Sequence, residues 1–221
     1  MEARQVGARD VGAREADVAP APEAAAPAAG WTPANPGPLG LAAFALTTFV
    51  LSMLNANLVA VPRGVGAVLP LTLVYGGLVQ LLAGMWEFRT GNTFGAVAFS
   101  SYGGFWIALY VFFHQAAVLQ THQALSLYLW GWSIFTVLML VASLRTTGAL
   151  AGVFLILTIT FFLLAIGNAS LVGTTATTNG TIKLGGWFGI VTAAAAWYVA
   201  FAAVLASTFG REILPVFPFN R

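Results

Sequence analysis

The chain has 221 residues, of which 59% are hydrophobic and only 7% are charged. Soluble globular domains usually carry about 25% charged residues, so this composition predicts an integral membrane protein. The net charge is only +2 and no basic face is clustered, which argues against nucleic-acid binding. Because there is no cysteine, disulfides and thiolate metal sites are excluded.

The first segment, residues 1–34, is rich in Ala, Pro, Glu and Arg and has no apolar run long enough for a signal peptide. This composition is typical of disordered segments, so we expect a disordered cytoplasmic tail. The alternative is an artefact such as a misplaced start codon. No functional inference depends on this segment.

The first apolar run follows Asn35 and Pro36. Asn35 is a good capping residue, and Pro36 suits the first helical position because its missing N–H costs nothing there. Residues 39–60 contain no charge, and such a helix is about 33 Å long, enough to cross a hydrocarbon core of about 30 Å. Spans are predicted at about residues 39–60, 65–86, 94–118, 122–144, 147–169 and 182–207.

Six spans place both termini on the same side of the membrane. Only Arg63 and Lys183 would lie on the opposite side. Because cytoplasmic loops carry an excess of Lys and Arg, both termini are predicted to be cytoplasmic. The membrane is expected to be the plasma membrane. The basic residues on the side of the termini are Arg4, Arg9, Arg14, Arg89, Arg145, Arg211 and Arg221.

The predicted fold is therefore an all-α integral membrane protein with six transmembrane helices, and the family resemblance described below implies that they surround a narrow central pathway. Residues 35–215 would form the transmembrane domain, and residues 216–221 a short cytoplasmic C-terminus. Glycine pairs such as Gly148 with Gly152 permit close helix packing, either within a protomer or between protomers. Tryptophans near the span ends suit an interfacial belt, although some could pack inside: Trp86, Trp106, Trp130, Trp132 and Trp187.

Polar residues inside apolar spans indicate an internal pathway, because such side chains tend to face the bundle interior or water. Two spans repeat one pattern, in which an apolar residue is followed eleven positions later by an asparagine on the same helix face. These faces could line one conduit. The alternative is that the asparagines bond at the membrane interface and that the threonines bond their own backbone. The two faces are Phe44, Thr48, Leu51 and Asn55, and Leu157, Phe161, Leu164 and Asn168.

The connection before the third span is predicted to be a cytoplasmic turn in which Asn92 or Thr93 caps the helix. Residues 98–106, taken as the start of that span, mix hydroxyls, glycines and aromatic residues. A helix N-terminus could attract a small anion there without a fixed cation. Glu87 is predicted to be a poor internal proton carrier because it lies beside Arg89 at a span end, which favours channel-like passage.

Several motifs occur in order along residues 35–215, and together they resemble the acetate uptake transporter family. The likeness is specific because it combines these motifs with a six-span layout, and the tail is not covered. Gly37 departs from the family pattern, which usually has Ala or another small apolar residue there. The motifs are Asn35-Pro36-Gly37-Pro38-Leu39-Gly40-Leu41, Tyr75-Gly76-Gly77-Leu78-Val79-Gln80, Gly84-Met85-Trp86-Glu87-Phe88, Gly91-Asn92-Thr93-Phe94-Gly95, Ser101-Tyr102-Gly103-Gly104-Phe105-Trp106, Leu164-Ala165-Ile166-Gly167-Asn168 and Phe209-Gly210-Arg211.

The resemblance implies a homo-hexamer with one pathway in each protomer, and acetate and other small monocarboxylates as substrates. It also implies a hydrophobic constriction of Phe44, Tyr102 and Leu157. An apolar ring tends to dewet and so excludes hydrated ions. We expect the methyl group of acetate to contact this ring, while Tyr102 O–H or nearby Thr and Asn side chains donate to its carboxylate. The expected pathway residues are Thr48, Asn55, Ser101, Thr160 and Asn168, and the family-motif residues are Asn35, Pro36, Pro38 and Gly40.

Other function classes have less support. An enzyme is not expected, because His114 and His122 lie at helix ends and no Asp follows Asp17. No metal site or other cofactor is expected either. A nontransporting acetate sensor or scaffold remains as the alternative, and substrate flux would distinguish it. The order of preference among acetate, propionate, lactate and succinate stays open.

Overall fold

The computed structural model describes Trp31 and residues 33–219, apart from the side chains of residues 61–63 and 117. The expected N-terminal tail therefore lies almost entirely outside the described residues. Residues Pro33–Arg221 form one compact unit, which contains all of the helices described below.

Six helical segments in the described part of the chain are long and apolar enough to cross a membrane. The second of them, Gly64–Thr90, runs continuously through α2, a π-helical stretch and α3. This confirms the predicted all-helical fold with six spans. The helices are α1 (Gly37–Asn55), α2 (Val61–Leu73), the π-helix η1 (Val74–Val79), α3 (Gln80–Thr90), α4 (Thr93–Phe113), α5 (His122–Ser143), α6 (Gly148–Ala169) and α7 (Gly180–Phe209), with a short 3₁₀ turn, η2 (Ala117–Leu119), before α5.

The helix starts show which capping predictions hold. The side chain of Asn92 accepts a hydrogen bond from the Gly95 N–H at 3.1 Å, so Asn92 caps α4 as predicted. The prediction for α1 is off by one position, because Pro36 is the cap residue. Asn35 lies just before it and accepts from the Gly37 N–H at 2.9 Å, so its side chain closes a local turn and does not cap the helix.

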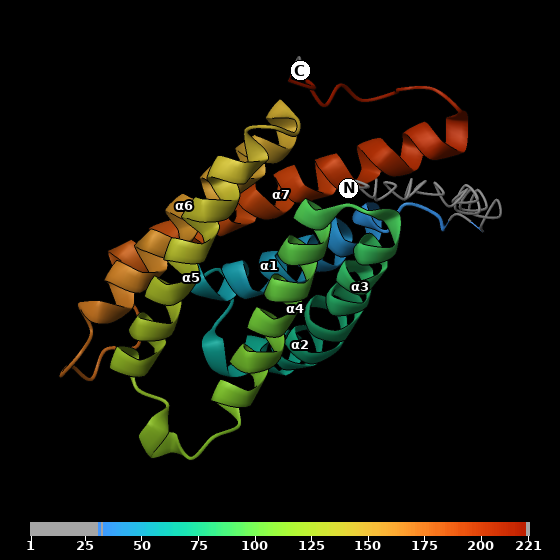
Figure 1. Ribbon diagram of the computed structural model, residues 1–221. Coiled ribbons are helices and arrows are strands. Elements are labelled where there is room, and N and C mark those ends of the chain that lie inside the picture. The colour runs from blue at the N-terminus through green and yellow to red at the C-terminus, as the bar shows by residue number, and fades with distance from the viewer. Residues whose placement is uncertain (1–30, 32, 220–221) are drawn as a thin grey trace, which may run out of the picture. The chain divides into compact units, whose positions relative to one another are not determined.

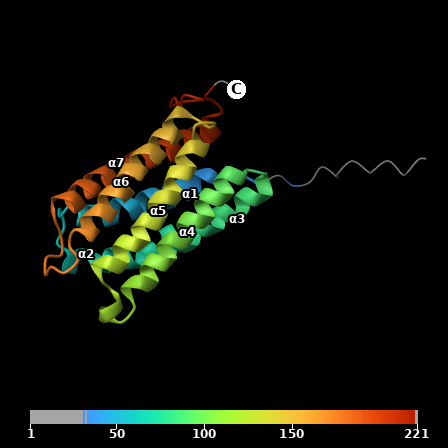
Figure 2. The ribbon, with the colours of Figure 1, turned by 60° about the vertical axis from the view of Figure 1, so that its left-hand side comes forward.

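Helix α1 lies centrally, in contact with α2, η1, α3, α4 and α7. Helix α6 packs between α5 and α7, and α3 packs along α4 (Figures 1 and 2). Glycines set the closest approaches: a Cβ on Gly186 of α7 would overlap the backbone of Ala56 at the end of α1. Small residues therefore allow these helices to touch through their backbones.

The second span is irregular in its middle. Pro70 lies inside α2 and has no N–H, and the regular ladder gives way to the π-helix η1 four residues later. Gly76 of η1 leaves room for Thr47 of α1, since a Cβ there would lie 2.7 Å from the Thr47 hydroxyl oxygen. Directly after η1, Gln80 is turned into the protein and is only 1% exposed.

The segment after α7 returns to the start of α6. The N–H of Gly148 donates to the carbonyl of Phe217 at 2.7 Å, and that of Ala149 donates to Val216 at 3.2 Å. These bonds satisfy two of the N–H groups that a helix N-terminus leaves free. Residues 216–219 of the predicted short C-terminus (residues 216–221) thus contact the start of α6.

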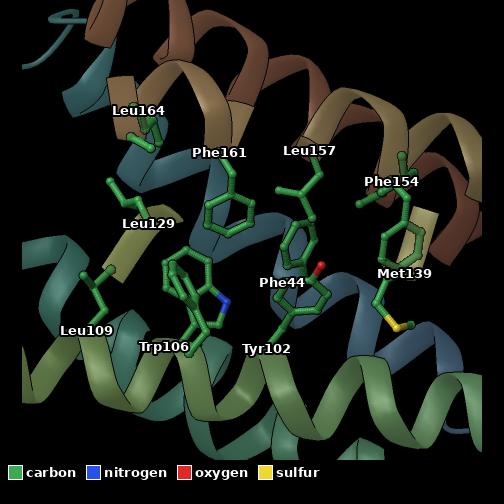
Figure 3. Close-up of a cluster of buried hydrophobic side chains, with 14 of the residues drawn as sticks. Phe44, Tyr102, Trp106, Leu109, Leu129, Met139, Phe154, Leu157, Phe161 and Leu164 are labelled. Carbon is green, nitrogen blue, oxygen red and sulfur yellow. The ribbon is translucent and has the colours of Figure 1, made fainter. Parts of the chain in front are cut away.

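The buried core contains a cluster of hydrophobic side chains from α1, α4, α5 and α6, several of them aromatic (Figure 3). Trp106, one of the tryptophans that suit an interfacial belt by sequence, is only 2% exposed and belongs to this cluster. Trp130 and Trp187 are 37% and 51% exposed, as an outward-facing position requires. The tryptophans therefore divide between the interior and the surface.

Candidate functional site

Two cavities lie along the middle of the helical bundle. The larger, of about 210 Å³, lies among the starts of α1, α4 and α6 and the ends of α3 and α7. We call it the large cavity. Its polar lining residues are Asn35, Gln80, Glu87 and Asn92.

The second cavity, of about 80 Å³, lies toward the opposite ends of α1, α4 and α6 and is closed by the start of α5. We call it the small cavity. All eight residues of the two predicted helix faces line it, as does Thr160. Ser101, also expected on the pathway, lines neither cavity.

Phe44 and Leu157 line both cavities and so mark the place where they meet. Tyr102 lines the large cavity, with its ring centroid 5.8 Å from that of Phe44. All three side chains are at most 5% exposed. Figure 3 shows Phe44 between Tyr102 of α4 and Leu157 of α6. The structure therefore brings the three expected constriction residues together, and their role in transport stays a prediction.

The hydroxyl of Tyr102 is already engaged. It lies 2.9 Å from the hydroxyl oxygen of Thr136, which itself donates its only proton to the carbonyl of Trp132 at 2.7 Å. Tyr102 must therefore be the donor in the bond to Thr136. This geometry opposes our expectation that Tyr102 donates to a carboxylate, because the phenolic proton is used on α5.

The threonines expected on the pathway differ from each other. Thr160 donates to the carbonyl of Ile156 at 2.9 Å, which agrees with the alternative that these threonines bond their own helix. The Thr48 hydroxyl has no hydrogen-bond partner among the described residues although it is buried. The same holds for the indole nitrogen of Trp106 and the amide oxygen of Gln80.

The two asparagines lie at the end of the small cavity farther from Phe44. Asn168 is 6% exposed, its amide nitrogen donates to Leu164, and its oxygen lies 3.0 Å from Nδ1 of His122. Asn55 is half-buried and lines the same cavity. His122 thus fixes one of the polar residues at this end, a contact between α5 and α6 that sequence spacing does not reveal.

Glu87 differs from its prediction. It is 2% exposed and accepts hydrogen bonds from Asn92 at 2.9 Å and Thr90 at 3.2 Å, while Arg89 is exposed. No ion pair of Glu87 is found within the described part of the chain. Its carboxylate lies against Gly95, in the first turn of α4. Glu87 does lie near the end of its span, which ends at Thr90, as predicted. Its buried carboxylate is bonded to Asn92 and Thr90, however, and not to the exposed Arg89.

The predicted anion site at the N-terminus of the third span also needs correction. Helix α4 begins at Thr93, so residues 98–106 lie inside the helix, where the backbone N–H groups are already bonded. The true first turn is occupied by the carboxylate of Glu87 and the side chain of Asn92. The protein thus supplies its own anion at this helix end.

No Lys or Arg among the described residues lines either cavity. Among the described residues, no group of three His, Asp or Glu side chains could hold a metal ion. A negatively charged molecule in these cavities would therefore depend on hydrogen-bond donors such as amides, hydroxyls and the indole N–H.

Residues 18–221 match the sequence model of the GPR1/FUN34/yaaH family. Acetate permease A of Emericella nidulans is 45% identical over 197 residues, which are 82% of this chain and 66% of the fungal protein. The chain thus spans just under two thirds of that relative. The succinate-acetate/proton symporter SatP of Escherichia coli K12 is 40% identical over 182 residues, covering 80% of this chain and 92% of SatP.

A solved structure, that of the bacterial acetate channel SatP, has the same fold. Its TM-score is 0.76 at 38% sequence identity, and the match covers 84% of this chain and 99% of that one. The relatives are thus named both as a proton symporter and as a channel.

Proposed function

The chain belongs to the GPR1/FUN34/yaaH family, and we propose that it transports acetate and other small monocarboxylates across a membrane, with the dicarboxylate succinate as a further substrate. Its six apolar helical segments and its relatives make it a multi-pass membrane protein. The relatives named for acetate support the substrate class, and the uncharged walls of the constriction in this chain agree with it.

One observation carries the proposal: two cavities, which lie inside the bundle toward its opposite ends, meet at Phe44 and Leu157. Water is poorly held between such apolar side chains, so hydrated ions face a barrier there. A small carboxylate has a methyl group that can contact Phe44 and Leu157. Its charged end meets amide and hydroxyl groups on either side.

Passage is proposed to be channel-like. Among the described residues, the ionisable groups that line the cavities are Tyr102, whose hydroxyl is bonded to Thr136, and Glu87. Glu87 lies on the large-cavity side of the constriction, so none of the described residues places an acidic group between the two cavities to carry a proton across. A proton-coupled mechanism would have to rely on Glu87, which can exchange protons only on the large-cavity side of the constriction.

We also propose the assembly and orientation that the family resemblance and the arginines suggest. The protein forms a homo-hexamer with one pathway in each protomer, in the plasma membrane. Both termini face the cytoplasm. The large cavity lies near the end of α3, which contains Arg89, and near the start of α6, which follows Arg145. Since these arginines are proposed to face the cytoplasm, the large cavity opens to that side.

Labelled acetate uptake into vesicles containing the purified protein tests the proposed function. We expect saturable uptake above that of protein-free vesicles, with or without an imposed pH gradient. An acetate sensor or scaffold would bind acetate without accelerating its equilibration. Equal rates in both kinds of vesicle would therefore contradict transport, and uptake only with a pH gradient would contradict channel-like passage.

A further inference from the structure

His122 determines how the Asn168 side chain is turned at the end of the small cavity. Nδ1 of His122 lies 3.0 Å from the amide oxygen of Asn168, and the amide nitrogen of Asn168 donates to the carbonyl of Leu164 at 2.9 Å. Since an amide oxygen only accepts hydrogen bonds, Nδ1 must carry a proton and donate it. The imidazole ring of α5 therefore fixes the orientation of a cavity-lining amide of α6.

The second ring nitrogen of His122 is free to gain a proton. Nε2 has no hydrogen-bond partner within the described part of the chain, and it is not shut off from solvent, since His122 is only half-buried. Imidazole is the side chain that ordinarily changes its charge between about pH 5 and 8. Because the added proton goes to Nε2, the bond from Nδ1 to Asn168 stays intact. His122 can therefore become positive without releasing Asn168.

No acidic side chain among the described residues would balance this charge. Those residues include two acids, Glu87, which lines the large cavity, and Glu212, which follows α7. The start of α7 lies at the small-cavity end, because Asn179 donates to the carbonyl of Gly167, so Glu212 lies beyond the opposite end of this helix. The end of α6 and the turn η2 add no titratable group. The groups that the other elements place at this end are Tyr110 and His114 of α4, Arg63 of α2 and Lys183 of α7.

We propose that His122 makes the entry of carboxylates at the small-cavity end depend on pH. When its ring is protonated, a positive charge lies beside Asn168 and raises the concentration of anions at this entrance. His122 does not line the cavity, so it is a positioning residue that acts through Asn168 and through its electric field. This inference rests on the proposed transport function and names a residue that regulates it.

The effect of pH would differ between the two sides of the membrane. In the proposed orientation the large cavity opens to the cytoplasm, so the small cavity and His122 lie on the outer side. His122 then responds to the pH outside the cell. Acid outside increases uptake when acetate is scarce, because more of the His122 rings are charged.

Three variants separate the charge of His122 from its support of Asn168. His122→Gln keeps a hydrogen-bond donor for Asn168 but cannot become charged. His122→Lys carries a positive charge at every pH used. His114→Gln is the matched control, because His114 is exposed and its Nδ1 lies 2.8 Å from the carbonyl of Tyr110 on its own helix.

The measurement is the acetate concentration that gives half-maximal uptake into vesicles, between about pH 5.5 and 8, which brackets the usual titration of histidine. The pH is equal on both sides, and uptake by protein-free vesicles is subtracted. At the acidic limit, half-saturation of the wild type should be about threefold below that of His122→Gln, the scale of a partly exposed charge pair. The two should agree at the basic limit. His122→Lys should keep the low value throughout, and His114→Gln should follow the wild type.

The comparison between proteins at one pH cancels the ionisation of acetate itself, so the outcomes are distinct. If the wild type transports acetate but its half-saturation keeps a constant ratio to that of His122→Gln, His122 only supports Asn168; the inference is then wrong and transport stands. Should His122→Gln fail to fold, a constant ratio between the wild type and His122→Lys contradicts the inference in the same way. If the wild type fails to transport acetate, both proposals fall.

Discussion

The hydroxyl of Tyr102 gives the clearest distinction between packing and substrate contact at the constriction. Because its proton goes to Thr136, Tyr102→Phe should keep acetate uptake within about twofold of wild type. It should lower stability by about 1 kcal/mol, the usual net value of one hydrogen bond. Uptake in vesicles and thermal unfolding in detergent measure the two effects. A tenfold loss of uptake with unchanged stability would show that the hydroxyl contacts substrate.

Glu87 places a negative charge beside the path of an anion. At an effective dielectric constant near 20, two unit charges repel each other by about 1 kcal/mol or more at any separation up to about 16 Å. At neutral pH, Glu87→Gln should therefore lower the half-saturating acetate concentration about fivefold. The difference should vanish at a pH low enough to protonate Glu87, because both side chains are then uncharged.

Glu212→Gln is the matched control for this prediction, since Glu212 is exposed after the end of α7. It should leave acetate half-saturation unchanged at every pH. If Glu87→Gln behaves in the same way, the Glu87 carboxylate acts only as a support for Asn92 and the first turn of α4.

Sequence spacing could predict which residues face the small cavity but not what their polar atoms do. The interval of eleven residues from Phe44 to Asn55 fixes a helix face, and the structure places that face on the cavity. The bond from Tyr102 to Thr136 joins α4 to α5, and no periodicity within one helix reveals it. Trp106 suits the membrane interface by residue type, and only the tertiary packing shows that it is buried.

At the scale of helices, glycines determine how closely α7 approaches α1. A Cβ on Gly186 would overlap the backbone of Asn55 and Ala56, which cannot move as a flexible side chain can. Gly186→Ala should therefore destabilise the protein by about 1–3 kcal/mol or more. Gly131→Ala is the control, because nothing lies within 4 Å of a Cβ there. Thermal unfolding in detergent compares them, and equal midpoints would contradict the packing described.

The six spans could be predicted because apolar runs of this length have few other stable arrangements. Their ends could not be predicted as well. The first span ends at Asn55 and not near residue 60, since Asn57 adopts a left-handed conformation with φ of 61°. The π-helix η1 could not be predicted either, because hydropathy records neither the change of helix type after Pro70 nor the close approach of Gly76 to Thr47 of α1.

For the molecule as a whole, the proposed orientation can be tested by single cysteines, because the chain has none of its own. Thr177 is exposed in the loop before α7, and Glu212 is exposed after it. A thiol reagent that cannot cross membranes should label Thr177→Cys but not Glu212→Cys in intact cells. Both should react after the cells are opened. The reverse pattern would invert the orientation of the large cavity.

The open glycines bear on the proposed hexamer. A Cβ added to Gly104 or Gly152 would have nothing within 4 Å, so neither glycine is needed for the packing that the described residues show inside one protomer. The sequence alone does not separate packing within a protomer from packing between protomers. The protein mass of the native particle in detergent measures the assembly. A mass that corresponds to six chains of 23.1 kDa each would agree with the proposed hexamer.

The central claim is that small carboxylates pass between Phe44 and Leu157, and uptake of acids of different size tests it most directly. Phe44→Ala and Leu157→Ala widen the constriction, so uptake of butyrate relative to acetate should rise several-fold in each. Leu184→Ala, on the exposed face of α7, should keep the wild-type ratio. Wild-type ratios of butyrate to acetate in both constriction variants, at normal protein levels, would contradict passage at this point.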